Sequence, residues 1–540
     1  MIEQLTAYIS AHYDIDITPE LSRPDAAFGD IATNVALQLA GRLKCNPRQI
    51  AEELAEVLRS NPDFAEVTVA GPGFINVRLS DEALLQQLQV SVPQQYADTN
   101  VVIETNSPNP FKAMHIGHAM NAVVPDAIAN ILERAGAQVH RVSYHGDVGL
   151  HVGKSMYSLL KYAQGDVQRI AQIPKAERNS FMSRMYAEGA AAYKESEEAK
   201  REIDALAAQS FTCEDPLYKQ IYELCLEWSY QQIDETVARL GNKPIERRFV
   251  ESAADSRGVA IVKQHTPAVF TQSDGAYIFE GSKYGSFDNV FVSSNGRGLY
   301  AARDLGLMEL KNEAFHPDKS VIVTGGEQGQ YFKGVIAAAE LSDPSLKGQT
   351  VNIPTGLVKL TTGKMSSRDG NVITIDWIFD QFRQAIEARG AVATDATIAG
   401  ALRYQFLKVK IGSDVIFDIN DAVSITGNTG SYLQYAHARA KSILRKIDHA
   451  EIKQLQPEDR ALVRKMGEYS DVVDLATRQL EPHHICQYLF ELAQEFNRYY
   501  ERNRVVGSEL QVHRAGLVAA YARILADGLA LLGIHAPDEL

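Results

Sequence analysis

The chain has 540 residues, 45% of them hydrophobic and 23% charged, which is ordinary for a globular protein and long enough for about two to four domains. Its net charge of −14 at pH 7 excludes broad nonspecific attraction to nucleic acid, so any such contact must come from a local basic surface. The four cysteines are widely spaced, which argues against a disulfide framework or a zinc ribbon and favours the reducing cytoplasm. We expect neither secretion nor a membrane span, because the sequence has no secretory signal and no run of 18 apolar residues.

The first part of the chain predicts a small α+β domain. Apolar residues recur at helical spacing over 29–42, with Asp30 as the candidate cap, and again over 51–58. Residues 67–79 alternate apolar and polar positions around Gly-Pro-Gly, which predicts two strands and a turn. A polar, proline-containing stretch at 91–99 predicts a linker.

After residue 100 the pattern changes to strand, loop, helix and strand. VVIE at 101–104 and VHRVSY at 139–144 are the expected strands, with a helical pattern from about Gly117 to Gly136 between them. This βαβ unit predicts a parallel sheet whose ligand lies outside the carboxyl ends of the strands. We expect Pro125 to kink or split the helix.

The rest of the chain predicts a helical insertion, a return to strands and a helical end. Residues 154–240 are largely helical and polar, and the strand-like pieces AYIFEG, NVFVSS, SVIVTGG and TVNIPT follow. From about 388 the pattern is nearly all helical. We therefore predict a multidomain α/β fold: a small α+β N-terminal domain, a parallel-sheet core with a helical insertion, and an all-α C-terminal bundle.

Two loops carry the chemistry. In KAMHIGHAMN, Gly117 stands at a helix start between His115 and His118, with Lys112 just before them. A glycine there lets the backbone approach an anion, and helix N–H groups, imidazoles and a lysine stabilise phosphate charge. A metal site is the other interpretation of this pattern, although HExxH is absent.

The second loop, GLVKLTTGKMSSRDGN at 356–371, would by itself be an ordinary solvated turn. Together, however, HIGH at 115–118 and KMSSR at 364–368 resemble the paired HIGH and KMSKS signatures of class I aminoacyl-tRNA synthetases. They occur in the right order on a chain with a βαβ unit. A coincidence of two unrelated loops is therefore a poor explanation.

Longer stretches resemble arginyl-tRNA synthetases across nearly the whole chain. That family's tRNA-elbow-contacting domain is resembled by FGDIATNVALQLA and VAGPGFINVRL. Its catalytic core is resembled by ETNSPNPFKAMHIGH, SDGAYIFEG, GLYAARDLG and GGEQGQYF. Its anticodon-binding bundle is resembled by TGSYLQYAHARAKSILRK and LALLGIHAP. The resemblance implies an N-terminal domain at 1–92, a Rossmann-like catalytic domain at 98–387 with an insertion at about 154–265, and an anticodon-binding domain at 388–540. It also implies a cytoplasmic monomer.

The implied reaction joins L-arginine to tRNA(Arg) through arginyl-adenylate, with ATP as substrate, Mg²⁺ on the pyrophosphate and no metal held by the protein itself. Catalysis would be positioning and charge stabilisation without a covalent protein intermediate. The implied catalytic residues are Lys112, His115, His118 and Lys364. The implied ATP-binding residues are His115, Gly117, His118, Lys364, Met365 and Ser366.

Arginine itself calls for acidic residues, because its guanidinium is a planar fork of donors that carboxylates can hold. By resemblance, Glu104 at a strand end and Asp304 on a helix form that grip, while Asn109 and Gln328 hold the α-amino and carboxylate end. The complete set implied for arginine binding is Glu104, Ser107, Asn109, Tyr300, Asp304 and Gln328.

The predicted tRNA contact is a helix without acids between Ser431 and Lys446. Aromatic and cationic side chains on it suit unpaired anticodon bases and their backbone. The implied tRNA-binding residues are Tyr432, Tyr435, Arg439, Lys441 and Arg445. A solvated basic helix face is the alternative that the residues alone leave open.

Four residues depart from the family pattern. Met120 replaces an Arg after HIGH, His151 a Gln, Tyr331 a His in QxxHF, and Ser367 the second Lys of KMSKS. Because the proposed guanidinium grip is intact, these changes put kinetic detail in doubt more than the substrate.

Three other functions remain open. The chain could be a class I enzyme for another amino acid, or a catalytically silent tRNA-binding paralogue, although such a paralogue should have lost its signature loops. It could also be a metal-dependent hydrolase whose ligands would be His115, His118, His145 and His151.

Overall fold

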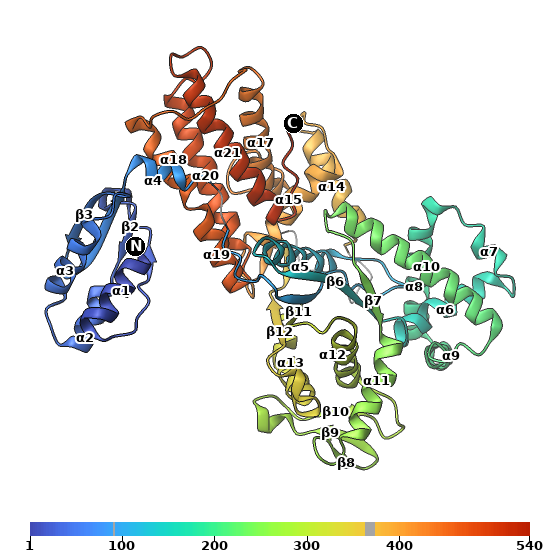
Figure 1. Cartoon of the computed structure of the whole chain (residues 1–540). Helices are drawn as coiled ribbons and strands as arrows, with labels where there is room; N and C mark the ends of the chain where they lie inside the picture. Colours follow the sequence, from blue (N-terminus) through green and yellow to red (C-terminus); the bar gives the residue numbers. More distant parts are fainter. Residues whose placement is uncertain (90–91, 362–372) are drawn as a thin grey trace.

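The computed structural model describes residues 1–89, 92–361 and 373–540. In Figure 1 the N-terminal domain (blue) lies at one side, and the parallel sheet lies in the middle of the molecule. The short helix α4 (Asp81–Gln86), which ends the N-terminal domain, contacts a bundle of helices (orange to red). Within the described residues, no helix has the length and apolar character needed to cross a membrane.

The N-terminal domain is a four-stranded antiparallel sheet with four helices, the last of them short. Its strand order is β1-β2-β4-β3. The elements are α1 (Ile2–Tyr13), β1 (Leu21–Ser22), β2 (Ile31–Thr33), α2 (Val35–Leu43), α3 (Pro47–Arg59), β3 (Phe64–Ala70), β4 (Phe74–Leu79) and the short helix α4 (Asp81–Gln86). The prediction of a small α+β domain is confirmed. The helix predicted over 29–42 was wrong at its start, because Ile31–Thr33 pairs with β1 and β4, and Asn34 rather than Asp30 precedes α2.

The central sheet is parallel, with strand order β12-β11-β5-β6-β7. Its strands are β5 (Asn100–Glu104), β6 (Gln138–His145), β7 (Arg247–Val250), β11 (Lys319–Gly325) and β12 (Thr350–Thr355). Helix α5 (Ile116–Arg134) joins β5 to β6 and runs unsplit through Pro125. The strand order reverses between β5 and β11, the point at which open α/β sheets bind ligands.

Helices and a small antiparallel sheet extend this core. The insertion holds α6 (Leu150–Ala163), α7 (Gln168–Ala171), α8 (Arg178–Glu195), α9 (Glu197–Gln209) and α10 (Pro216–Arg239). After β7 come α11 (Glu251–Gln264), β8 (Thr271–Ser273), β9 (Ala276–Phe279), β10 (Asn289–Val292), α12 (Tyr300–Phe315) and α13 (Gly329–Ser342). Gly258 and Gly306 let α11 and α12 touch, because a Cβ at either would lie 1.7 Å or 2.1 Å from a carbonyl oxygen of the other helix. This close packing fixes the position of α12.

The C-terminal part is helical, as predicted, except for one short strand. Its helices are α14 (Ile375–Glu387), α15 (Asp395–Leu407), α16 (Ile419–Ala422), α17 (Gly430–Leu444), α18 (Arg460–Gly467), α19 (Tyr469–Gln479), α20 (His483–Arg502) and α21 (Gln511–Leu531). The strand β14 (Val415–Phe417) pairs in parallel with β13 (Val358–Leu360), which precedes the KMSSR segment. The bundle is thereby tied to the catalytic core.

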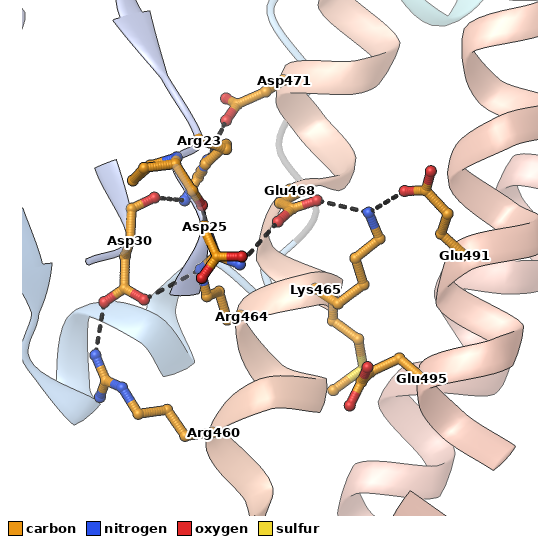
Figure 2. Close-up of polar contacts among 12 residues, drawn as sticks. Arg23, Asp25, Asp30, Arg460, Arg464, Lys465, Glu468, Asp471, Glu491 and Glu495 are labelled. Carbon is orange, nitrogen blue, oxygen red and sulfur yellow. Dashed lines mark hydrogen bonds and ion pairs between the residues drawn. The ribbon is translucent and has the colours of Figure 1, made fainter. Parts of the chain in front are cut away.

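Asp30 joins the N-terminal domain to the bundle (Figure 2). Its carboxylate, 4% exposed, lies 2.6 Å from Arg460 and 3.3 Å from Arg464, both on α18, and accepts a backbone N–H from β4. A second ion pair, Arg23 with Asp471 at 2.7 Å, lies beside it. The acid that the sequence suggested as a helix cap therefore serves a contact between domains.

A buried ion pair joins the bundle to α5. Asp126 of α5 accepts from Arg403 of α15 at 2.8 Å, and neither side chain is exposed to solvent. Arg141 of β6 reaches the other oxygen of Asp126 at 3.3 Å. The remaining donors of Arg403 are bonded to Asn242 and to the carbonyl oxygens of Leu240 and Leu532.

We predict that Arg403→Met lowers the free energy of unfolding by about 3–5 kcal/mol, because Asp126 is left as a buried charge without its closest partner. Chemical denaturation followed by circular dichroism measures this loss. The control Arg59→Met removes a surface arginine and should change stability by less than about 0.5 kcal/mol. Equal losses in the two variants would contradict the prediction.

Candidate active site

A pocket of about 490 Å³ lies at the carboxyl ends of the parallel strands, where the sequence predicted a ligand. It brings together all six residues predicted for arginine: Glu104, Ser107, Asn109, Tyr300, Asp304 and Gln328. They come from β5, the loop after it, α12 and the segment after β11. Residues far apart in the sequence thus meet at the reversal of strand order.

The two acids of this pocket that the sequence predicted, Glu104 and Asp304, each have a protein donor. Lys311, itself buried, donates to Glu104 Oε1 at 2.8 Å, and the Tyr331 hydroxyl donates to Asp304 Oδ2 at 2.6 Å. Burial raises the pKa of Asp304 to about 7, the Tyr331 hydrogen bond opposes this rise, and the charges of Glu104 and Glu251 add to it. Glu104 is paired with a lysine, whereas the hydrogen-bond donor to Asp304 among the described residues is a neutral hydroxyl.

The sequence prediction missed four titratable residues that line the pocket: Tyr144, Glu251, Glu327 and Tyr331. Tyr144 lies near the end of β6, and its hydroxyl is buried without a hydrogen-bond partner among the described residues. Glu251 follows β7 and is bonded to Arg303 at 3.1 Å, while burial raises its pKa. The ends of the second and third strands were the signal that could have found the first two.

The loop after β5 is held against the end of β6 by side chains. Ser107 Oγ accepts the backbone N–H of Tyr144, and Asn109 Oδ1 accepts that of Gly146, both at 3.0 Å. Because these bonds leave the Asn109 amide nitrogen and the Ser107 hydroxyl proton for other partners, both side chains can also donate to a ligand.

The HIGH residues cap the start of α5. The backbone N–H of Gly117 donates to His115 Nδ1, and that of His115 donates to His118 Nδ1, each at 3.1 Å, while the two rings stack at 3.7 Å. Since each Nδ1 accepts, the proton of each neutral imidazole is on Nε2, which remains a donor. A Cβ on Gly117 would lie 3.0 Å from the His115 ring, so a larger residue here would press on the ring that forms the cap.

Burial keeps these imidazoles neutral. It lowers the pKa of His115 to about 4 and that of His118 still more clearly, with a further contribution from the nearby charge of Lys112. Burial and the charge of Lys154 lower the pKa of Lys112 itself. The helix start therefore offers two neutral N–H donors and one cation, which suits an anionic ligand.

The predicted residues Lys364, Met365, Ser366 and Ser367 lie outside the described residues. The chain just after them is described, and Thr374 pairs with His115 in an isolated antiparallel bridge. Ile375 donates its backbone N–H to the carbonyl of Met114 at 3.2 Å. The segment that follows KMSSR thus lies against the HIGH segment.

The histidines suggested for a hydrolytic metal site are bonded elsewhere. His145 Nδ1 donates to the Pro108 carbonyl at 2.6 Å while its Nε2 accepts from Arg248, and His151 Nε2 donates to the Gly146 carbonyl at 2.7 Å. Within the described ranges, the one group with ligand atoms close enough for a metal is Glu481, His483 and His484, at the start of α20 and outside this pocket.

The departures from the family pattern have different surroundings. Met120 lies on α5, is 5% exposed and packs into the core, His151 bonds the loop after β6, and Tyr331 contacts Asp304. Ser367 lies outside the described residues. Three of the four changed residues, Met120, His151 and Tyr331, therefore lie in the site or in the elements that pack around it.

Helix α17 divides the predicted tRNA-binding residues between two faces. On one face, the Tyr432 hydroxyl accepts from Asn497 at 2.7 Å and Arg439 lies 4.8 Å over the ring of Tyr500, so both pack against α20. Tyr435, 41% exposed, belongs to the same side by helical spacing.

The opposite face of α17 meets the end of the chain. Lys441 lies 3.5 Å from the Asp538 carboxylate, and Arg445 donates to the Asp538 carbonyl at 2.9 Å and lies 3.5 Å from Glu539. The structure therefore does not bring the five predicted residues onto one surface. The period of the helix separates 441 and 445 from 432 and 439 by about half a turn.

Comparison with known families agrees with this architecture. Residues 1–79 match the arginyl-tRNA synthetase N-terminal domain, 80–397 the class I tRNA synthetase (R) catalytic domain, and 433–540 the DALR anticodon-binding domain. The chain belongs to the arginyl-tRNA synthetase family. The name arginine--tRNA ligase is carried by relatives in Thermobifida fusca and Limosilactobacillus fermentum, each 30% identical, with alignments that cover 97% of this chain and 96% of each relative.

Solved arginyl-tRNA synthetases have the same fold. The Thermus thermophilus enzyme superposes with a TM-score of 0.84 at 24% identity, covering 100% of this chain and 99% of that one. The Plasmodium falciparum enzyme gives 0.82 at 19%, covering 100% and 98%. The fold prediction, with its α+β, parallel-sheet and helical domains, is confirmed.

We predict that the contribution of His145 to stability is constant above about pH 6.5 and falls as the pH drops toward 4. Burial lowers its pKa from 6.5 to about 4, so over this window the unfolded chain binds a proton that the folded chain does not. His145→Gln should make the slope of unfolding free energy against pH shallower by up to about 1.4 kcal/mol per pH unit. The exposed control His449→Gln should keep the original slope, and an unchanged slope in His145→Gln would refute the assignment.

Proposed function

We propose that this chain makes arginyl-tRNA from L-arginine, ATP and tRNA(Arg), with arginyl-adenylate as intermediate and with pyrophosphate and AMP released. Family membership supplies the reaction class. The observation that carries the choice of amino acid is the pocket at the ends of β5 and β11, which Glu104 and Asp304 both line. It lies on the same edge of the sheet as the loop that leads into α5.

In this proposal the guanidinium binds between the two acids. Glu104 Oε1 and Asp304 Oδ2 are already hydrogen-bonded to Lys311 and Tyr331, so each acid offers its other oxygen to a different nitrogen of the substrate. A lysine ammonium is a single point of charge and fills this arrangement less well. Arginine also supplies the cation that Asp304 lacks.

The adenylation step uses the start of α5. The arginine carboxylate oxygen attacks the α-phosphorus of ATP, a new carboxyl–phosphate bond forms, and the bond to the pyrophosphate oxygen breaks. The Nε2–H groups of His115 and His118 donate to phosphate oxygens, Lys112 and Lys364 balance their charge, and Gly117, Met365 and Ser366 contact ATP. One donor of this kind contributes about 3–4 kcal/mol to the transition state. The terminal ribose 2′-OH of the tRNA then takes the arginyl group, and AMP leaves.

We propose that Mg²⁺ enters on the phosphates of ATP and neutralises the pyrophosphate. The signature side chains at the helix start, Lys112, His115 and His118, offer nitrogen atoms, whereas Mg²⁺ prefers oxygen ligands and keeps several waters. These residues therefore fit an ion carried by the nucleotide rather than one held by the protein.

For the tRNA we propose that Tyr432, Tyr435 and Arg439 bind anticodon nucleotides. We also propose that Lys441 and Arg445 bind phosphates after Asp538 and Glu539 at the chain end move away from them. The three functional regions would be 1–92, 98–387 and 388–540, acting in one monomer. The four cysteines are all free, as a reducing cytoplasm requires.

We predict that Glu104→Gln and Asp304→Asn each lower kcat/KM for arginine at least ~30-fold, equivalent to about 2 kcal/mol or more, because each removes a charged acceptor from a partly buried cation site. Formation of arginyl-tRNA at saturating ATP and tRNA measures this loss. The matched control Asp274→Asn changes an exposed loop acid and should behave as wild type. Wild-type rates in both site variants would rule out this grip.

We predict that Tyr435→Ala weakens tRNA binding by about 1–3 kcal/mol, the usual contribution of one stacked base. Filter binding of tRNA(Arg) measures the affinity, and KM for arginine should stay unchanged. The control Lys347→Ala removes an exposed cation from the catalytic domain. If both variants bind tRNA equally well, α17 does not contact the anticodon through this face.

A further inference from the structure

Tyr331 is the residue of the pocket that the family pattern explains least. It lies on α13, in a position where the pattern has histidine, and its hydroxyl reaches across to Asp304 on α12 at 2.6 Å. Both side chains line the same pocket. The contact joins two helices at the point where the cationic end of the substrate would bind.

The cations near Asp304 are bonded to other acids. Lys311 donates to Glu104 at 2.8 Å, and Arg303 is divided between Glu251 at 3.1 Å and Asp255 at 3.0 Å. The other titratable groups of this pocket are the hydroxyls of Tyr144 and Tyr300 and the carboxylate of Glu327. Among the described residues, Tyr331 is the donor with a hydrogen bond to Asp304.

We propose that Tyr331 is a positioning residue that determines selectivity for a cationic amino acid, in that it holds the Asp304 carboxylate in place without neutralising it. A lysine or arginine in the place of Tyr331 would orient the acid equally well but would also satisfy its charge. A neutral hydroxyl leaves that charge for the substrate. This inference rests on the proposed function, since the cation in question is the arginine guanidinium.

The two acids then have different tasks. Glu104 is charge-paired with the buried Lys311, so it acts mainly as a hydrogen-bond acceptor of fixed direction. Above its raised pKa, Asp304 carries a charge that has no cationic partner among the described residues, so it makes the pocket favour a cation. A neutral isostere of arginine such as citrulline would leave that charge unmatched, a large penalty in a partly buried site.

Removal of the hydroxyl tests this division. In Tyr331→Phe the ring remains but Asp304 loses its donor, so we expect KM for arginine to rise about tenfold while KM for ATP is unchanged. The hydrogen bond lowers the pKa of Asp304, so its loss raises that pKa, and the acidic limb of kcat/KM for arginine moves to higher pH. Tyr331→His restores a neutral donor above the pKa of the imidazole and should recover most of the affinity near pH 8.

Controls separate this effect from folding and from the proposed function. Tyr284→Phe removes an exposed hydroxyl and should keep both KM and the pH limb. Wild-type values in Tyr331→Phe, together with wild-type arginylation, would overturn the Tyr331 proposal alone. If the wild-type protein forms no arginyl-tRNA, the proposed function fails. In that case, calorimetric titration of arginine into wild type and Tyr331→Phe decides the role of Tyr331. Weaker binding to Tyr331→Phe supports the Tyr331 proposal, whereas equal binding to both proteins, or no binding to wild type, overturns it.

Discussion

The buried carboxylate of Asp126 is the point on which the catalytic core depends. It receives Arg403 from the helical bundle and Arg141 from β6, in a place with no access to water. A buried charge without partners is very costly, so α5, β6 and α15 can hardly move independently. Because α5 begins with the HIGH residues, the interaction also fixes the position of the phosphate-binding helix start relative to the domain proposed to bind the anticodon.

In the active-site pocket, by contrast, not every carboxylate is paired with a cation. Glu104 and Glu251 each have a cationic partner, whereas Asp304 has a tyrosine. Among the described residues, Asp304 therefore has no cationic partner at the position where a guanidinium would bind, and Glu327 is a further acid of the same pocket. At the other end of the site, the buried histidines His115 and His118 stay neutral. They offer N–H donors without adding positive charge next to Lys112.

The sequence predicted much of this arrangement, and the failures have physical causes. The βαβ pattern after residue 100 led directly to the parallel sheet, and the signature loops led to six residues that line one pocket. Local periodicity failed at Ile31–Thr33, because pairing with β1 and β4 overrode helical spacing. It also could not show that Asp30 contacts α18, that Tyr331 reaches Asp304, or that the chain end covers Lys441, since each is a contact between distant segments.

The central claim is that arginine is the amino acid activated here, and pyrophosphate exchange tests it most directly. The exchange is measured with each of the twenty amino acids in turn, with and without tRNA(Arg). We predict exchange with arginine above all others in at least the samples that contain tRNA. Exchange with a different amino acid, or none with any amino acid under either condition, would contradict the account.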